Sequence, residues 1–299
     1  MSSTEYHVNR RELQFVVMEF LEAGKLCSLD AFSDFDEELF SMTINEACTF
    51  AEQVLDPINQ NGDREGCRVK DGTVITPEGF PEAWTKMGEG GWLAMNMSPE
   101  VGGMGLPELV TVAAKEVQLA ANQSLCIGNT LTTGSANLIY NFGSEKQKEK
   151  FCEKMLNGTW SGTMCLTEPH AGSSVGDIIT TAVKQPEGHF LIKGTKQFIT
   201  TGDHDMSENI IHLLLARTAG APDGTKGISL FIVPKFRDDG TTNDVTLVNI
   251  EQKMGLHASP TCVLSFGENQ DCHGYLLQGE NLGMAQMFQM MNEARLFVG

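Results

Sequence analysis

The sequence has 299 residues, of which 41% are hydrophobic, and this length is sufficient for two domains with sizeable cores. Its 39 acidic residues outnumber its 21 basic residues, which gives a formal net charge of −18 at pH 7. Nucleic acid is therefore not an expected partner, because its binding requires clustered Lys and Arg side chains that displace counterions from the phosphates.

The eight cysteines include no C-x-x-C pair, and no histidines stand beside them at metal-ligand spacing. The sequence thus predicts neither a metal site nor a disulfide framework, and the cysteines are interpreted as reduced thiols of a cytoplasmic protein. No segment approaches the roughly 18 apolar residues of a membrane span, and the N-terminus lacks the apolar core of a secretion signal. We therefore expect no membrane span.

The first predicted elements are helices. Residues 9–23 place apolar side chains on one helical face, and this helix is expected to end at Gly24, since glycine is a common C-cap. Ser33 and Asp36 predict the start of a second helix, whose apolar period continues to Asp56-Pro57. Residues 59–79 are polar and rich in glycine, so they predict a long surface loop.

Further helices are predicted up to residue 157. Their expected starts are Pro81, Pro107, Ile127 and Glu145. Ser144 and Gln147 form a capping-box pattern at the last of them. The glycine-rich segment 99–106 lacks the third glycine of a dinucleotide fingerprint, which argues against a Rossmann fold. We assign residues 1–157 to an N-terminal helical domain, with 1–34 as an extension.

The apolar period changes from helical to alternating at Thr159. Short apolar runs are then separated by turn signals such as Pro222-Asp-Gly224. These runs are 162–166, 178–183, 189–192, 210–216, 227–233, 245–250 and 262–266. Short strands at this spacing predict a compact antiparallel β-barrel, which we assign to residues 158–278.

A helical period returns after Gly283, with one apolar face formed by Met284, Met287, Phe288 and Met291. The sequence stops within this pattern without a C-cap. We therefore expect residues 279–299 to be the first helix of an incomplete C-terminal helical domain. The predicted fold class is α+β multidomain: a helical domain, an antiparallel β-barrel, and the truncated start of a helical bundle.

Residues 164–178 combine the end of an apolar run with many small and turn-forming residues. This composition predicts a strand, a tight loop and a second strand. Successive N–H groups in such a loop can bind an anion such as a phosphate, with help from neighbouring hydroxyls. An ordinary hairpin connection explains the same composition equally well.

The pattern Thr-Glu-Pro-x-Ala-Gly-Ser at 167–173 is followed by Lys-Gln-Phe-Ile-Thr at 196–200. Together they resemble the flavin-binding signature of the acyl-CoA dehydrogenase family. The resemblance implies a β-barrel domain that binds FAD. It places the hydroxyl of Thr167 near the reactive nitrogen of the flavin and Ser173 at the pyrophosphate of the cofactor.

The same resemblance implies further contacts to the flavin ring. The backbones of Met164 and Leu166 are expected to line the ring. Where the family usually has Trp-Ile-Thr, this sequence has Phe-Ile-Thr, so Phe198 keeps the aromatic face but loses the indole donor. Phe198 and Thr200 complete the expected cofactor-binding set.

The resemblance covers essentially the whole chain, and segments 202–234 and 253–260 narrow it to the longer subgroup that includes 3-(methylthio)propanoyl-CoA dehydrogenases. It implies α,β-dehydrogenation of an acyl-CoA thioester in fatty acid metabolism, with electrons passing to an electron-transferring flavoprotein. A homo-oligomer is expected for the full-length protein. Ser173 and Arg295 are the implied substrate contacts, although Arg295 also fits a surface arginine paired with Glu251 or Glu293.

Dehydrogenation requires a carboxylate base. The family's base is a glutamate of the C-terminal helical domain, so we expect it beyond Gly299 and expect this chain to be nearly inactive. Glu168 lies in the signature, where the resemblance implies a structural role. His170 and the cluster 203–205 are interpreted as loop and turn residues. The alternative function is a non-catalytic fragment or binding module of the same shape.

Overall fold

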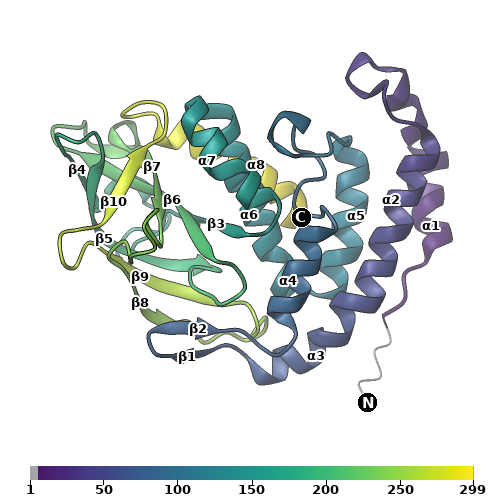
Figure 1. Ribbon diagram of the computed structural model, residues 1–299, viewed down its shortest axis with the longest axis horizontal. Coiled ribbons are helices and arrows are strands. Elements are labelled where there is room, and N and C mark those ends of the chain that lie inside the picture. The colour runs from purple at the N-terminus through teal and green to yellow at the C-terminus, as the bar shows by residue number, and fades with distance from the viewer. Residues whose placement is uncertain (1–5, 299) are drawn as a thin grey trace.

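The first half of the chain is helical, as its apolar period predicts. The computed structural model describes residues 6–298 and places these helices on one side of the molecule, with a β-barrel on the other (Figure 1). The helices are α1 (Arg10–Gln14), α2 (Glu37–Phe50), α3 (Asp56–Glu65), α4 (Phe80–Glu89), α5 (Glu108–Ala121), α6 (Gln123–Phe142) and α7 (Glu145–Leu156). The predicted capping box at Ser144 is present.

The first helix ends earlier than predicted. After α1 the chain forms a π-helical turn, Phe15–Phe20, and Glu22 then adopts a left-handed conformation with φ of 52°. Gly24 is not a C-cap, because it lies inside the 3₁₀ segment Ala23–Ser28. A Cβ atom on Gly24 would lie 2.0 Å from a side-chain oxygen of Glu37, so this glycine permits close approach to α2.

The predicted loop at 59–79 is wrong. A π-helical turn, Ala51–Leu55, joins α2 to α3, and Pro57 lies in the first turn of α3, where the absent N–H is tolerated. A hairpin follows, formed by β1 (Arg68–Lys70) and β2 (Thr73–Ile75). Its turn is Asp71-Gly72, with both φ angles positive, as a type I′ hairpin turn requires.

The second half forms a closed barrel, but its strands are not all antiparallel. The strands are β3 (Trp160–Cys165), β4 (Thr181–Lys184), β5 (Phe190–Thr200), β6 (Asn209–Thr218), β7 (Ser229–Pro234), β8 (Val245–Ile250), β9 (Thr261–Phe266) and β10 (His273–Leu276). The order is β10-β7-β6-β4-β5-β9-β8, and β10 also pairs with β5 and closes the ring. β3 and β4 both run parallel to β6, which corrects the antiparallel prediction.

The reason for the mixed pairing lies in β6. Nine of its ten residues are buried, and only Arg217 is partly exposed. Residues 210–216 are a nearly continuous apolar run, which is typical of a strand that is covered on both faces and has parallel neighbours. The continuous run was readable in the sequence, whereas the identity of its partners was not.

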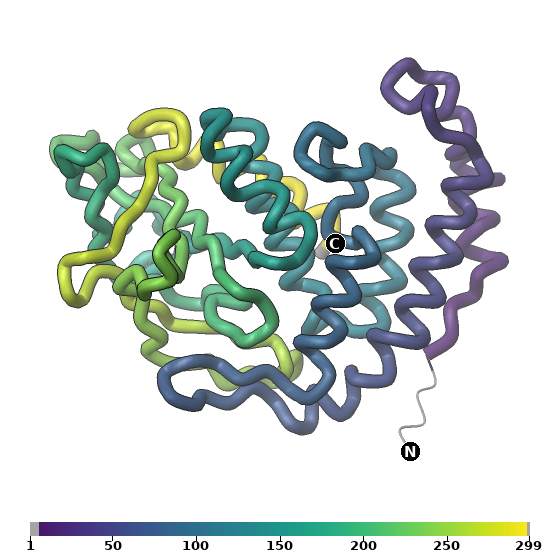
Figure 2. Tube along the Cα trace, in the orientation of Figure 1, coloured from purple at the N-terminus to yellow at the C-terminus, as the bar shows by residue number. Residues whose placement is uncertain are grey.

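The last helix, α8 (Gly283–Val298), packs against both halves of the molecule. Figure 2 shows its yellow tube passing behind the teal helices, and it contacts α6 and β7. Gly134 on α6 allows this approach, since a Cβ atom there would lie 3.1 Å from Cγ of Met290. Met287 and Met290 are buried, while Phe288, which the apolar face was expected to include, is 46% exposed.

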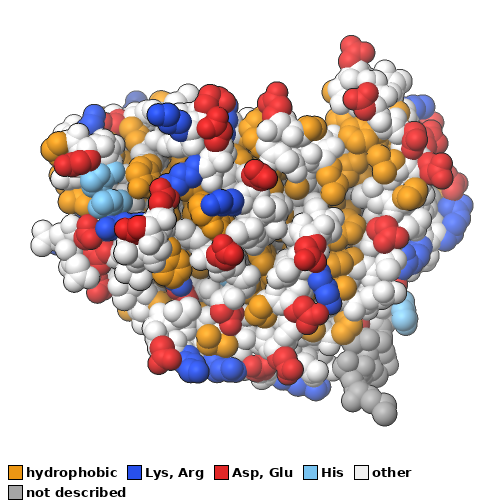
Figure 3. Space-filling model, in the orientation of Figure 1, with side chains coloured by type: hydrophobic (Ala, Val, Ile, Leu, Met, Phe, Trp, Pro, Cys, Tyr) orange, Lys and Arg blue, Asp and Glu red, His pale blue; other side chains and the backbone are white. Residues whose placement is uncertain are grey.

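The surface agrees with the charge balance of the sequence. On the face drawn in Figure 3, Lys and Arg side chains are scattered among Asp and Glu and form no basic patch. Of the helices within residues 6–298, none combines the length and the apolar character needed to cross a membrane.

Candidate functional site

The signature loop connects β3 to β4 and is closed by a buried carboxylate. Glu168 exchanges two backbone hydrogen bonds of 3.0 Å with Ala171, which form a tight turn. Its side chain is buried and accepts hydrogen bonds from the backbone N–H groups of Ile179 (2.8 Å) and Thr180 (3.1 Å). Glu168 therefore fixes the far end of the loop against its beginning.

A buried lysine neutralises this carboxylate. Nζ of Lys196, on β5, lies 2.8 Å from Oε1 of Glu168, and both side chains are almost completely buried. The same ammonium donates to the carbonyl of Leu166 at 3.0 Å. Burial opposes ionisation of Glu168, but the Lys196 charge and the hydrogen bonds outweigh it and hold its pKa below the usual value. Glu168 is thus a structural anion.

Next to this ion pair, β5 contains a bulge that presents an aromatic ring. The register between β5 and β9 shifts between Lys196 and Ile199. Within the bulge, Phe198 has φ of 59° and is 57% exposed, which is an uncommon conformation for an aromatic residue. Bulges and left-handed residues of this kind concentrate at functional sites.

The structure brings the two halves of the signature together. The N–H of Gln197 donates to the carbonyl of Thr167 at 2.8 Å, so the loop lies directly against the bulge. Met164 and Thr167 are partly exposed, Leu166 is 8% exposed, and Thr200 is partly exposed on β5 opposite Thr261. The cofactor-binding residues assigned from the sequence therefore come from two adjacent segments.

Ser173 lies in the exposed tip of the loop. Gly172, Ser173 and Ser174 are exposed, and their N–H groups donate to no acceptor within residues 6–298. Within the same range, the hydroxyls of both serines form no hydrogen bond. Successive free N–H groups flanked by hydroxyls are suited to binding a phosphate.

Arg295 is placed on the exposed side of α8. Its guanidinium donates to Oδ1 of Asn292 at 2.6 Å. The acidic partners considered for it are engaged elsewhere: Glu251 accepts from Nε2 of Gln197 at 3.1 Å, and Glu293 accepts from Nδ2 of Asn137 at 2.5 Å. The guanidinium is therefore accessible at the surface of this helix.

The polar residues considered as competitors have separate structural partners. His170 is exposed and lies 3.2 Å from the carbonyl of Asp177. Asp203 forms an ion pair of 2.7 Å with Lys235, while Asp205 accepts from the hydroxyl of Thr76 at 2.6 Å. The described part of the chain contains no group of three His, Cys, Asp or Glu side chains arranged to hold a metal.

Two residues that organise the site were not predicted from the sequence. Lys196 belongs to the Lys-Gln-Phe-Ile-Thr motif, but its structural role depends on burial that only the folded barrel provides. Arg217 on β6 donates to the carbonyls of Ile178 and Pro222 at 3.0 Å, and so links the signature loop to the 220–227 segment. A single arginine after a buried apolar run was the available signal.

Two buried histidines lie beside β3. Nε2 of His204 is 2.9 Å from Oγ of Ser161, and Nδ1 of His212 is 2.7 Å from Oγ1 of Thr163. Burial, reinforced by the charge of Lys235, lowers the pKa of each imidazole from 6.5 to about 3. Both histidines are therefore neutral in the folded protein.

This burial predicts sensitivity to mild acid. Below pH 6.5 these two histidines become protonated in the unfolded chain, whereas in the folded protein they stay neutral. The free energy of unfolding therefore falls as the pH decreases from 6.5 to about 3. At pH 5 the loss should be about 2 kcal/mol per histidine. Urea unfolding at pH 7 and pH 5 measures it. His212→Asn should reduce the pH dependence.

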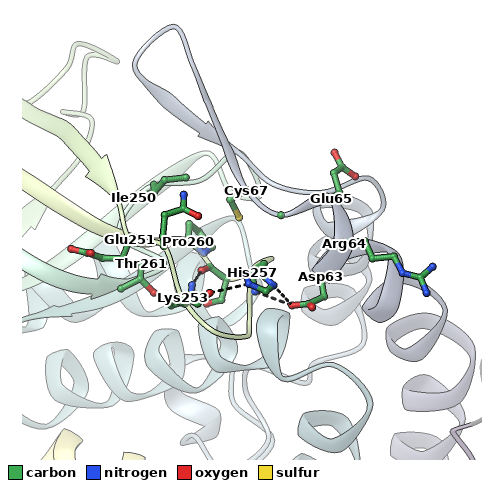
Figure 4. Close-up of a pocket in the computed structure, with 13 residues that line it drawn as sticks. Asp63, Arg64, Glu65, Cys67, Ile250, Glu251, Lys253, His257, Pro260 and Thr261 are labelled. Atoms are coloured by element: carbon green, nitrogen blue, oxygen red, sulfur yellow. Dashed lines mark hydrogen bonds and ion pairs between the residues drawn. The ribbon is translucent and has the colours of Figure 1, made fainter.

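A separate pocket of about 440 Å³ lies between the end of α3 and the segment that joins β8 to β9. Figure 4 shows His257 at its centre, with Nδ1 3.1 Å from Asp63 and Nε2 2.9 Å from the carbonyl of Lys253. None of the predicted flavin-binding residues lines it. Glu251 at its edge is the side chain that contacts Gln197 in the signature site.

Comparisons with known proteins cover both halves of the chain. The family models described as "Acyl-CoA dehydrogenase, N-terminal domain" and "Acyl-CoA dehydrogenase, middle domain" match residues 37–159 and 163–268. The 3-methylmercaptopropionyl-CoA dehydrogenase of Ruegeria pomeroyi is 39% identical over 98% of this chain and 50% of its own length. A butyryl-CoA dehydrogenase of Syntrophomonas wolfei is 42% identical over 100% of this chain and 51% of its own length.

Comparison with solved structures supports the same family. The structure of an acyl-CoA dehydrogenase from Bacillus anthracis complexed with FAD matches with a TM-score of 0.71 and 25% identity, over 88% of this chain and 41% of that one. The chain spans about half the length of the curated relatives it matches.

Proposed function

This chain belongs to the acyl-CoA dehydrogenase family, and from that premise we propose that its full-length protein is an FAD-dependent enzyme that dehydrogenates an acyl-CoA thioester. The single observation that carries the proposal is the contact between the Thr167 loop and the Phe198 bulge, which joins the two parts of the flavin signature. The similarity to the Ruegeria pomeroyi enzyme supports a short acyl substrate such as 3-(methylthio)propanoyl-CoA.

The residues present fit FAD. The exposed ring of Phe198 offers an aromatic face, Thr167 offers a hydroxyl that has no other partner within the described residues, and the free N–H groups beside Ser173 suit a pyrophosphate. Met164, Leu166 and Thr200 supply the remaining wall. When bound, FAD supplies the acceptor for the β hydride of the substrate.

The residues of this chain would bind and orient FAD and the acyl-CoA, and none of them is proposed as the catalytic base. Glu168 is ionised, but its oxygens are occupied by Lys196 and by the N–H groups of Ile179 and Thr180, so it does not fit the role of a base. We propose that the base is the family's C-terminal glutamate, beyond Gly299. Arg295 is proposed beside the acyl-CoA, with Ser173 as a second substrate contact.

The partners follow from the same proposal. Electrons from the acyl-CoA must leave the enzyme, and an electron-transferring flavoprotein is the proposed acceptor. We also propose that the full-length protein is a homo-oligomer. Sedimentation of the full-length protein as a monomer at micromolar concentration would contradict that assembly.

A second function is favoured by the engagement of Glu168. A chain whose signature carboxylate is committed to structure, and which carries no other assigned base, fits a non-catalytic module that keeps the shape of the first two domains. Protein that remains colourless and takes up no added FAD would favour this second function over the enzyme.

The cofactor site is tested by substitution of Thr167. Thr167→Val removes the hydroxyl but keeps the size of the side chain, so the dissociation constant of FAD should rise by about tenfold, as expected for loss of one well-placed hydrogen bond. Flavin fluorescence and absorbance titrations measure it, with the exposed Thr241→Val as the matched control. An unchanged constant together with an unchanged flavin spectrum would reject the assignment of this loop.

A further inference from the structure

Arg217 holds the signature loop by donating hydrogen bonds to backbone carbonyl groups of the loop. Nε donates to the carbonyl of Ile178 at 3.0 Å, and Nη2 donates to the carbonyls of Gly176 and Gly224, the latter at 2.8 Å. Nη1 donates to the carbonyl of Pro222 at 3.0 Å. The guanidinium thus connects two 3₁₀ turns, Val175–Asp177 and Gly224–Gly227, at one end of the barrel.

The two turns are in direct contact around this side chain. A Cβ atom on Gly176 would lie 3.4 Å from both Cα of Gly224 and the backbone nitrogen of Thr225. A Cβ atom on Gly227 would lie 1.7 Å from the carbonyl oxygen of Pro222, so the second turn requires glycine there. The planar fork of Arg217 therefore joins backbone segments that lie too close for bulky side chains between them.

Glu168 and Arg217 bind different backbone groups of the loop. Glu168 accepts from the N–H groups of Ile179 and Thr180, and Arg217 donates to the carbonyls of Gly176 and Ile178. With both ends fixed in this way, the tip carrying Ser173 keeps its N–H groups free. An anion-binding loop needs this arrangement, because its donors must point outward before the ligand arrives.

Arg217 forms no ion pair within the described residues. Its four partners are neutral carbonyl oxygens. The chain carries a net charge of −18, which disfavours anions in general. Arg217 therefore places a positive charge at the base of the loop whose tip has free N–H groups, and a positive charge there favours a phosphate.

We infer that Arg217 is a positioning residue for a diphosphate group bound at the Ser173 loop. The inference rests on the proposed function, since FAD and the coenzyme A part of the substrate both contain a diphosphate. Arg217 acts through the loop and does not touch the ligand. Its role depends on four directed hydrogen bonds from the planar guanidinium. Lysine keeps the charge but lacks this set of N–H donors, so it should not replace Arg217.

The test compares ligands that differ in the diphosphate. FAD, riboflavin and coenzyme A are each titrated against the wild-type chain, Arg217→Lys, Arg217→Gln, Ser173→Ala and Thr167→Val. Arg217→Lys and Arg217→Gln should each raise the dissociation constant of the diphosphate ligand by about tenfold or more, through the loss of preorganised donors. Riboflavin has no phosphate, so its binding should not change in either variant, and this also shows that both variants are folded.

The two possible sources of the diphosphate give different results. A loss restricted to FAD assigns the loop to the cofactor, and a loss restricted to coenzyme A assigns it to the substrate. In the ligand-free chain, the amides of Asp177 and Ile178, which are hydrogen-bonded inside the loop, should exchange faster in Arg217→Lys than in the wild type.

Two outcomes overturn the inference while leaving the proposed function intact. If Thr167→Val and Ser173→Ala weaken FAD but Arg217→Lys binds FAD and coenzyme A like the wild type, Arg217 supplies at most charge. If Arg217→Lys weakens riboflavin as much as FAD, its effect is general and not directed to the diphosphate. By contrast, FAD binding that is insensitive to both Thr167→Val and Ser173→Ala rejects the proposed site itself.

Discussion

Replacement of Lys196 by Met is expected to lower the free energy of unfolding by about 3–5 kcal/mol, because it leaves the carboxylate of Glu168 buried without a counter-charge. The ammonium also donates to the carbonyl of Leu166, so the substitution removes two contacts that hold the signature loop. Urea unfolding followed by circular dichroism at pH 7 measures the loss as a shift of the midpoint.

Two further variants show whether the loss comes from the buried charge. In the double variant Lys196→Met, Glu168→Gln neither side chain is charged, so most of the lost stability should return. The matched control is Lys86→Met, which breaks an exposed pair with Glu82 and should leave the midpoint unchanged. Equal midpoints for Lys196→Met and Lys86→Met would show that the buried pair does not stabilise the loop.

The 299-residue chain is expected to dehydrogenate acyl-CoA at close to the background rate, even with excess FAD. General base catalysis contributes about 10²- to 10⁴-fold, and Glu168 is held by Lys196 and by two backbone N–H groups. An assay with an artificial electron acceptor measures turnover on short, medium and methylthio substrates. The Syntrophomonas wolfei butyryl-CoA dehydrogenase, prepared in parallel, provides the positive control.

Turnover comparable to that control would mean that a base lies within this chain. Glu168→Gln would then be the first variant to examine. A loss of activity in that variant without a loss of folding would convert Glu168 from a structural residue into a catalytic one. An inactive wild-type chain that still binds FAD agrees with the proposal that the base lies beyond Gly299.

Local signals in the sequence were sufficient for some elements. The capping box at Ser144 fixes the start of α7, because both of its hydrogen bonds join residues three positions apart. The Asp71-Gly72 pair also marks a turn, although the polar composition around it predicts a long loop. The sequence did not predict that helical structure continues past Pro57, because Pro57 lies in the first turn of α3, directly after the π-helical turn Ala51–Leu55.

Pairings between distant segments explain the remaining differences. The parallel contact between β3 and β6 joins residues about fifty positions apart in sequence, and turn signals say nothing about it. The positive φ of Phe198 depends on a register shift against β9. The hydrogen bonds from Arg217 reach two loops, one between β3 and β4 and one between β6 and β7. The sequence motif predicts a candidate site, but the residues that support its loop became visible only in the fold.

We propose that the flavin binds where the Thr167 loop meets the Phe198 bulge. The most direct measurement is a crystal structure of this chain grown with excess FAD. We expect density for the flavin ring between Thr167 and Phe198 and for the pyrophosphate beside Ser173. Density for FAD in the pocket around His257 and Asp63, with the Ser173 loop empty, would contradict it.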